Sequence, residues 1–78
     1  MPTVLRVGAS RYFFYSNEGT EPPHIHVQEG KRLAKFWLEP VSLSWSTGFR
    51  GHELSEIERT VSEQKEKLKE AWDEFFSA

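Results

Sequence analysis

The chain has 78 residues with a formal net charge of −2, and it contains no cysteine. This length predicts one domain over residues 1–78, near the lower limit at which a hydrophobic core is self-sufficient. The absence of cysteine excludes disulfides and thiolate sites, and the slightly acidic charge argues against a broad nucleic-acid surface. No apolar run approaches the roughly 18 residues that span a bilayer, and the first residues lack the layout of a signal peptide. We therefore expect a cytoplasmic protein with no membrane partner.

The first half of the chain carries the patterns of β-strands separated by turns. Aromatic side chains dominate one run, and another alternates apolar residues with serine, which is typical of a strand with one buried face. The expected strands are residues 3–7, 11–16, 24–27, 33–38 and 41–45, with turns at 8–10 and 28–31. They predict two hairpins that form a small antiparallel sheet of four to five strands within residues 3–45.

The second half has the period of a helix. Apolar residues recur at spacings of three and four, at Leu54, Ile57, Val61, Leu68, Ala71, Trp72, Phe75 and Phe76. Within the helical part, residues 51–77, a single helix of about 25 residues would be about 37 Å long, which exceeds the width of a four-stranded sheet. We therefore expect an α+β fold whose C-terminal amphipathic helix is bent or split near residues 62–65. If the helix stayed straight instead, its aromatic end would project and would need a partner surface to cover it.

Two of the three histidines lie on one expected strand, directly after Pro22 and Pro23. Residues two apart on a strand point to the same side, so His24 and His26 project together, and Ile25 faces the core. The prolines hold the preceding loop in an extended form. The sequence therefore predicts a pair of imidazoles on one surface of the sheet, beside a stiff loop.

One interpretation of the pair is a divalent-metal site. Neutral imidazole is a good zinc ligand, but such a site needs a third protein ligand. His52, Glu18 and Glu21 are the available candidates, and the set His24, His26 and His52 is the one we name for zinc.

A second interpretation is a small metal-independent ribonuclease that acts on RNA. His24 and His26 would serve as base and acid because the pKa of imidazole lies near working pH. Arg11, Lys35 or Arg50 would stabilise the developing charge on phosphate. Gln28 occupies the next alternate position, so the pattern is not that of the histidine-triad nucleotide hydrolases.

A third interpretation gives the pair a structural role, in which the imidazoles hydrogen-bond the adjoining loop or the helix. The pair alone does not distinguish an enzyme from a binding protein or from a plain structural domain. No cofactor is required by the sequence beyond the zinc alternative.

Five segments together resemble the domain-of-unknown-function 4160 family: MPTVLR, RYFFYSNEGTEPPHIHV, AKFWLEPVSL, GFRGHELSEIERTV and LKEAWDEFF. By this resemblance, Pro22, Pro23, His24 and His26 match the family signature, and Trp72 matches its C-terminal tryptophan. The resemblance implies a small bacterial protein that is often encoded beside a second small protein, in an arrangement like a toxin–antitoxin pair.

The resemblance and the aromatic helix end together favour a function in protein–protein contact. The expected partner is the small protein encoded by the neighbouring gene, and a homodimer is the alternative. The expected partner or ligand surface consists of Arg11, Tyr15, Pro22, Pro23, Trp72, Phe75 and Phe76.

Overall fold

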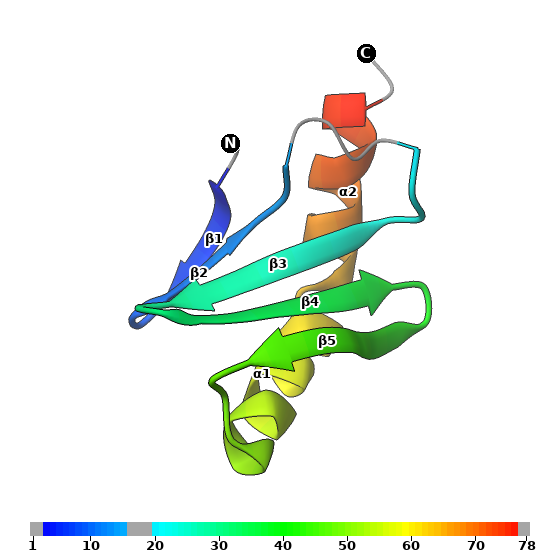
Figure 1. The fold of residues 1–78 in the computed structure, drawn as a ribbon. Coiled ribbons are helices and arrows are strands. Elements are labelled where there is room, and N and C mark those ends of the chain that lie inside the picture. The colour runs from blue at the N-terminus through cyan, green and yellow to red at the C-terminus, as the bar shows by residue number, and fades with distance from the viewer. Residues whose placement is uncertain (1–2, 16–19, 77–78) are drawn as a thin grey trace.

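The structure is a computed structural model that describes residues 3–15 and 20–76. Five antiparallel strands form one sheet in the order β1-β2-β3-β4-β5, and two helices follow the last strand (Figure 1). The elements are β1 (Thr3–Val7), β2 (Ser10–Phe13), β3 (His24–Glu29), β4 (Arg32–Leu38), β5 (Val41–Thr47), α1 (Gly51–Glu63) and α2 (Lys65–Phe76). The predicted α+β class is confirmed.

Each strand pairs with the next strand along the chain, so short turns account for most of the topology. Two of the turns are two-residue loops that begin with a glycine at positive φ, Gly8 at 59° and Gly30 at 62°. Glycine in the first position is typical of a type II′ hairpin turn, whose twist matches that of the flanking strands. The turn predicted at 28–31 was too wide, because β3 continues to Glu29 before the chain reverses.

Two other strand ends differ from the prediction. β2 ends at Phe13 instead of residue 16, and Phe14 and Tyr15 continue outside the regular ladder. β5 extends to Thr47, two residues beyond the expected end at 45. Strand ends depend on how far the neighbouring strand can offer hydrogen bonds, which composition alone does not show.

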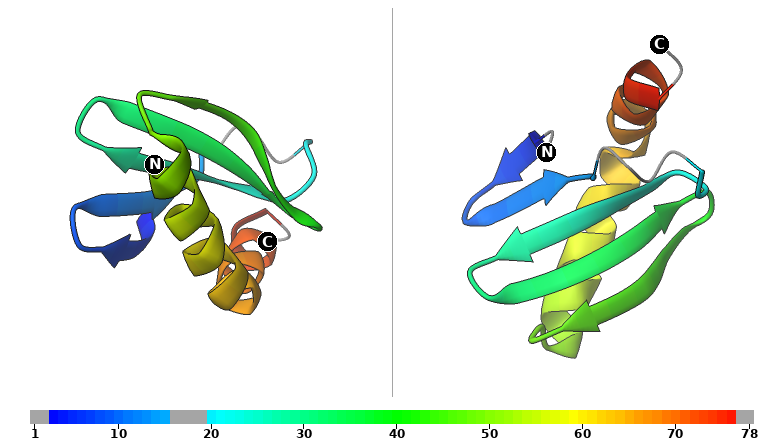
Figure 2. Two further views of the ribbon diagram at one scale, coloured as in Figure 1. Left: turned by 90° about the horizontal axis from the view of Figure 1, so that it is seen from below. Right: turned by 45° about the horizontal axis from the view of Figure 1, so that its top comes forward.

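Both helices cover the same face of the sheet (Figure 2). The buried hydrophobic residues between the two layers are Tyr12, Phe14, Ile25, Val27, Ala34, Phe36 and Leu38 from the sheet side, and Ile57, Val61, Leu68 and Trp72 from the helices. Ile25 and Val27 are fully buried there, as their alternation predicted. Apart from the contact between Trp72 of α2 and His24 at the start of β3, the helices leave the other face of the sheet uncovered (Figure 2).

The helical part is split at Gln64, between α1 and α2, as the length argument predicted. The split lets α2 follow the sheet instead of leaving it, so Trp72 is only 5% exposed. The helical part starts at Gly51, as predicted. At this start, the backbone N–H of Arg50 donates to Glu53 Oε1 at 2.8 Å. Within residues 3–15 and 20–76, no helix is long and apolar enough to cross a membrane.

Candidate functional site: a histidine–aromatic cluster

The two strand histidines point to the face of the sheet opposite the helices, because their neighbours Ile25 and Val27 point into the core. The expectation that they form a surface pair is wrong. His24 is fully buried, and His26 is 3% exposed. Aromatic side chains from other strands and from α2 cover both rings.

We use the name histidine–aromatic cluster for the two imidazoles and the rings around them. Its members are Phe13, Tyr15, His24, His26, Trp37, Trp45 and Trp72. The two imidazoles contact one another edge to face, with ring centroids 5.2 Å apart. The cluster therefore joins four strands (β2, β3, β4 and β5), the segment after β2 and the second helix.

His24 connects the proline-containing loop to the rest of the molecule. Its Nδ1 lies 2.9 Å from the carbonyl oxygen of Pro22, and since a carbonyl can only accept, Nδ1–H is the donor. The next carbonyl, of Pro23, accepts from the backbone N–H of Leu38 at 3.0 Å. The imidazole ring contacts Trp72, with centroids 4.8 Å apart. Two hydrogen bonds and one ring contact thus fix the loop against β4 and α2.

His26 occupies the middle of the uncovered face. Its ring stacks on Phe13 at 5.5 Å between centroids and meets the edge of Tyr15 at 4.7 Å. Trp45 lies 6.2 Å away on the same face. These neighbours come from β2, the segment after it and β5, and together they shield the imidazole from solvent.

Lys35 is a cation beside His26, since the two residues are partners across β3 and β4. Its ammonium forms an ion pair with Glu21 Oε1 at 2.7 Å and lies 4.5 Å from the centre of the Trp37 ring. The Lys35 residue is 8% exposed. Because the Lys35 ammonium is buried and already paired with a carboxylate, it is poorly placed to bind a phosphate group.

The other predicted residues lie in different surroundings. Arg11 shares the uncovered face, with its guanidinium 4.4 Å from the centre of the Phe13 ring and a hydrogen bond of 3.1 Å to Gln28 Oε1. Pro22 is exposed, and Pro23 is half-buried. Arg50 precedes α1 and is exposed.

The C-terminal aromatic residues lie on the helix side of the molecule. Phe76 contacts Trp72, with centroids 4.3 Å apart, and Phe75 is 44% exposed. Both of them also contact Phe14. Only Trp72 of the predicted C-terminal set therefore belongs to the histidine–aromatic cluster.

The three proposed zinc ligands are not brought together. His52 is exposed in the first turn of α1, whereas His24 and His26 are buried in the cluster. No group of three His, Cys, Asp or Glu side chains within residues 3–15 and 20–76 could hold a metal ion. Glu18, another suggested ligand, lies outside the described residues.

Sequence reasoning missed the partners that complete the cluster, namely Phe13, Trp37, Trp45 and the Lys35–Glu21 ion pair. Alternation along each strand did carry a signal, because Phe13 and Tyr15 share one face of their segment. The missing information was the register, which places Phe13 opposite His26 and Trp45 opposite Lys35.

A hollow between the β1–β2 turn and α1 holds the one tyrosine whose pKa is shifted among the residues described. Burial raises the pKa of Tyr12 above its ordinary value of 10.0, a hydrogen bond with Thr60 lowers it, and the charge of Glu29 raises it. The phenol is therefore neutral at physiological pH, and it is a core residue rather than a base.

The comparisons with known proteins give one match, to a family of domains. The chain matches the family described as domain of unknown function DUF4160 over residues 10–73, a range that contains both histidines and Trp72. No curated protein and no solved structure matches it. His24 and Trp72, which are distant in sequence, contact one another in the structure. The chain belongs to the DUF4160 family of domains of unknown function.

Proposed function

We propose that the chain is a binding protein, one component of a toxin–antitoxin-like pair that acts by contact with the small protein encoded by its neighbouring gene. One observation carries the proposal. On the face of the sheet that no helix covers, Tyr15 and Trp45 are 37% and 42% exposed, while the imidazoles beside them are buried.

The residue types on this face suit protein recognition. Tryptophan, tyrosine and arginine dominate the energetics of protein interfaces, and Trp45, Tyr15 and Arg11 supply all three on one side of the sheet. Large exposed aromatic side chains on a small protein mark an interaction site. The fixed cluster beneath them keeps these side chains in place, which lowers the entropy lost on binding.

The same face is less suited to catalysis on RNA. A ribonuclease needs its acid and base within hydrogen-bond reach of the substrate, and both imidazoles are covered by rings. Lys35, the cation paired with His26 across the two strands, is neutralised by Glu21. The binding interpretation therefore explains more of the face than the ribonuclease interpretation does.

The test is to co-express the protein with its neighbouring gene product, purify the complex and measure its Kd by calorimetry. Trp45→Ala and Tyr15→Ala should each weaken binding by about tenfold or more, since interface aromatics of this kind contribute roughly 2 kcal/mol. Leu43→Ala is the matched control, because Leu43 is 41% exposed on the same strand but on the other face, opposite Phe36.

Independent migration of the two proteins at micromolar concentration would overturn the proposal. Cleavage of RNA by the isolated chain, abolished in His24→Ala and His26→Ala variants that remain folded, would establish the ribonuclease instead.

A further inference from the structure

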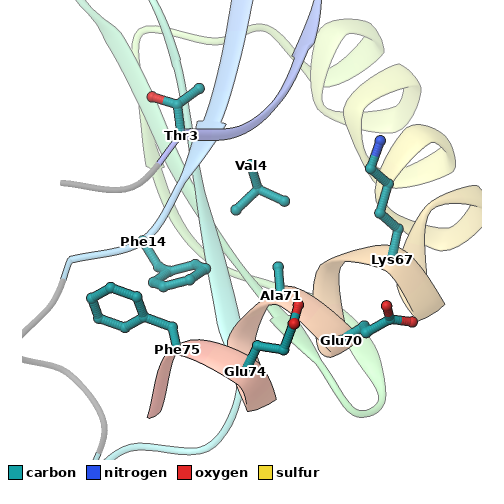
Figure 3. Close-up of a pocket in the computed structure, with 8 residues that line it drawn as sticks. All are labelled: Thr3, Val4, Phe14, Lys67, Glu70, Ala71, Glu74 and Phe75. Carbon is teal, nitrogen blue, oxygen red and sulfur yellow. The ribbon is translucent and has the colours of Figure 1, made fainter. Parts of the chain in front are cut away.

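A groove runs between β1 and α2, on the helix side of the molecule (Figure 3). It encloses a volume of about 580 Å³, within the range of ligand-binding sites. Its apolar lining consists of Val4 from β1, Phe14 after β2, and Ala71 and Phe75 from α2. Phe75 remains 44% exposed, so part of this apolar surface is open to solvent.

The helix contributes one continuous stripe to the groove. Its residues have the spacing i, i+3, i+4, i+7 and i+8 of one helix face: Lys67, Glu70, Ala71, Glu74 and Phe75. The carboxylates of Glu70 and Glu74 therefore lie one turn apart, beside the apolar lining (Figure 3). Neither forms an ion pair with any residue that the structure describes.

Like charges at positions i and i+4 of a helix repel one another and destabilise it by a few tenths of a kcal/mol. Glu66, one turn before Glu70, extends the row and shares a neighbouring polar hollow with Glu70 and Glu74. Asp73 and Lys69 also line this hollow, and Lys69 forms an ion pair with Glu39. A cation placed along this row would relieve the repulsion. The groove thus combines an apolar floor with a negative edge, and Lys67 is the one cation among the described residues that line it.

We propose that this groove binds a short segment of a partner protein in which large apolar side chains alternate with lysine or arginine. The apolar side chains enter between Val4 and Phe75, and the basic side chains pair with Glu70 and Glu74. The inference is independent of the proposed function, because the groove and the uncovered sheet face lie on different sides of the molecule.

The probe is a fluorescein-labelled amphipathic peptide made of leucine and lysine, and its binding is followed by fluorescence anisotropy at physiological ionic strength. The matching peptide of leucine and glutamate is the ligand control. Glu70→Lys/Glu74→Lys should weaken binding of the basic peptide at least about tenfold, equivalent to about 1.4 kcal/mol.

Glu58→Lys/Glu63→Lys is the matched variant, with the same change of net charge at two exposed positions on α1. It should bind the basic peptide within about twofold of the unmodified protein, which corresponds to less than about 0.5 kcal/mol. Equal weakening by both double variants, or equal affinity for both peptides, would overturn the proposal. The circular dichroism of each variant reports whether it is folded.

Two further variants separate the groove from the uncovered face. Phe75→Ala should weaken peptide binding because it removes part of the apolar lining, whereas Trp45→Ala should leave it unchanged. If Trp45→Ala weakened binding as much as Phe75→Ala, the peptide would be bound outside the groove and the inference would fail.

Discussion

At the scale of single residues, His24 is the position where the loop, the sheet and α2 meet. Its Nδ1–H fixes the carbonyl of Pro22, and its ring contacts Trp37 in β4 and Trp72 in α2. This arrangement supports the structural interpretation of the histidine: a buried donor with a hydrogen-bond partner specifies one loop position. His26 has a related role inside the cluster, between Phe13 and Tyr15.

A first prediction concerns His24→Ala. The substitution leaves a cavity among aromatic rings and the Pro22 carbonyl without its donor, so the free energy of unfolding should fall by about 2–4 kcal/mol. Urea denaturation followed by tryptophan fluorescence measures the change. His52→Ala, an exposed histidine of the same chain, should change it by no more than about 0.5 kcal/mol. Equal effects of the two variants would contradict the structural role.

At the scale of elements, the spacing of apolar residues along the sequence predicted all five strands and the helical part, because each has one face against the core. The break near residues 62–65 was predicted from length alone, since one straight helix would be longer than the sheet is wide. Strand register could not be predicted in the same way. It depends on contacts between segments, and register is what places Lys35 and Trp45 in one row with His26.

A second prediction concerns the start of α1. The pKa of Glu53 lies below its ordinary value of 4.5, first because its carboxylate accepts from the backbone N–H of Arg50. Burial opposes this effect, and the charge of Arg32 lowers the pKa further. Arg32 Nη1 lies 2.6 Å from the Glu53 carboxylate. A lowered pKa in the folded state means that this contribution to stability is complete above the unfolded value and is lost as pH falls through the folded one.

Glu53→Gln should therefore lower the melting temperature at neutral pH and reduce its decline as pH falls below 4.5. The melting temperature measured by circular dichroism from pH 7 down to the acid transition tests both parts. Glu58→Gln is the control variant, because it makes the same charge change at an exposed position of α1. A Glu53→Gln profile that runs parallel to the unmodified one across this range would exclude the assigned linkage.

At the scale of the whole molecule, the site was harder to predict than the fold because its members come from nearly every element. The alternation of His24 and His26 predicted their common direction, but not their burial. The rings that cover them belong to Trp37, Trp45 and Trp72, which follow in later elements and meet the histidines only through the sheet register and the split helix. Residues far apart in the sequence, such as His24 and Trp72, therefore meet in one cluster.

Because of this contact, we expect the packing of α2 against the sheet to depend on Trp72. Its ring joins α2 to Phe14 at 5.4 Å and to His24 at 4.8 Å, and only 5% of the residue is exposed. Removing a buried tryptophan ring costs about 3–5 kcal/mol, a large part of the roughly 5–15 kcal/mol that stabilises a folded protein. Trp72→Ala should accordingly lower the melting temperature by roughly 12 °C or more.

Differential scanning calorimetry measures this shift, and two substitutions on the same helix calibrate it. Trp72→Phe keeps an aromatic ring between Phe14 and His24, so it should retain more than half of the lost stability. Phe75→Ala removes a ring that is 44% exposed, and it should cost about 1 kcal/mol or less. If Trp72→Ala melted within a few degrees of the unmodified protein, α2 would be dispensable for the core, and the histidine–aromatic cluster would be held by the sheet alone.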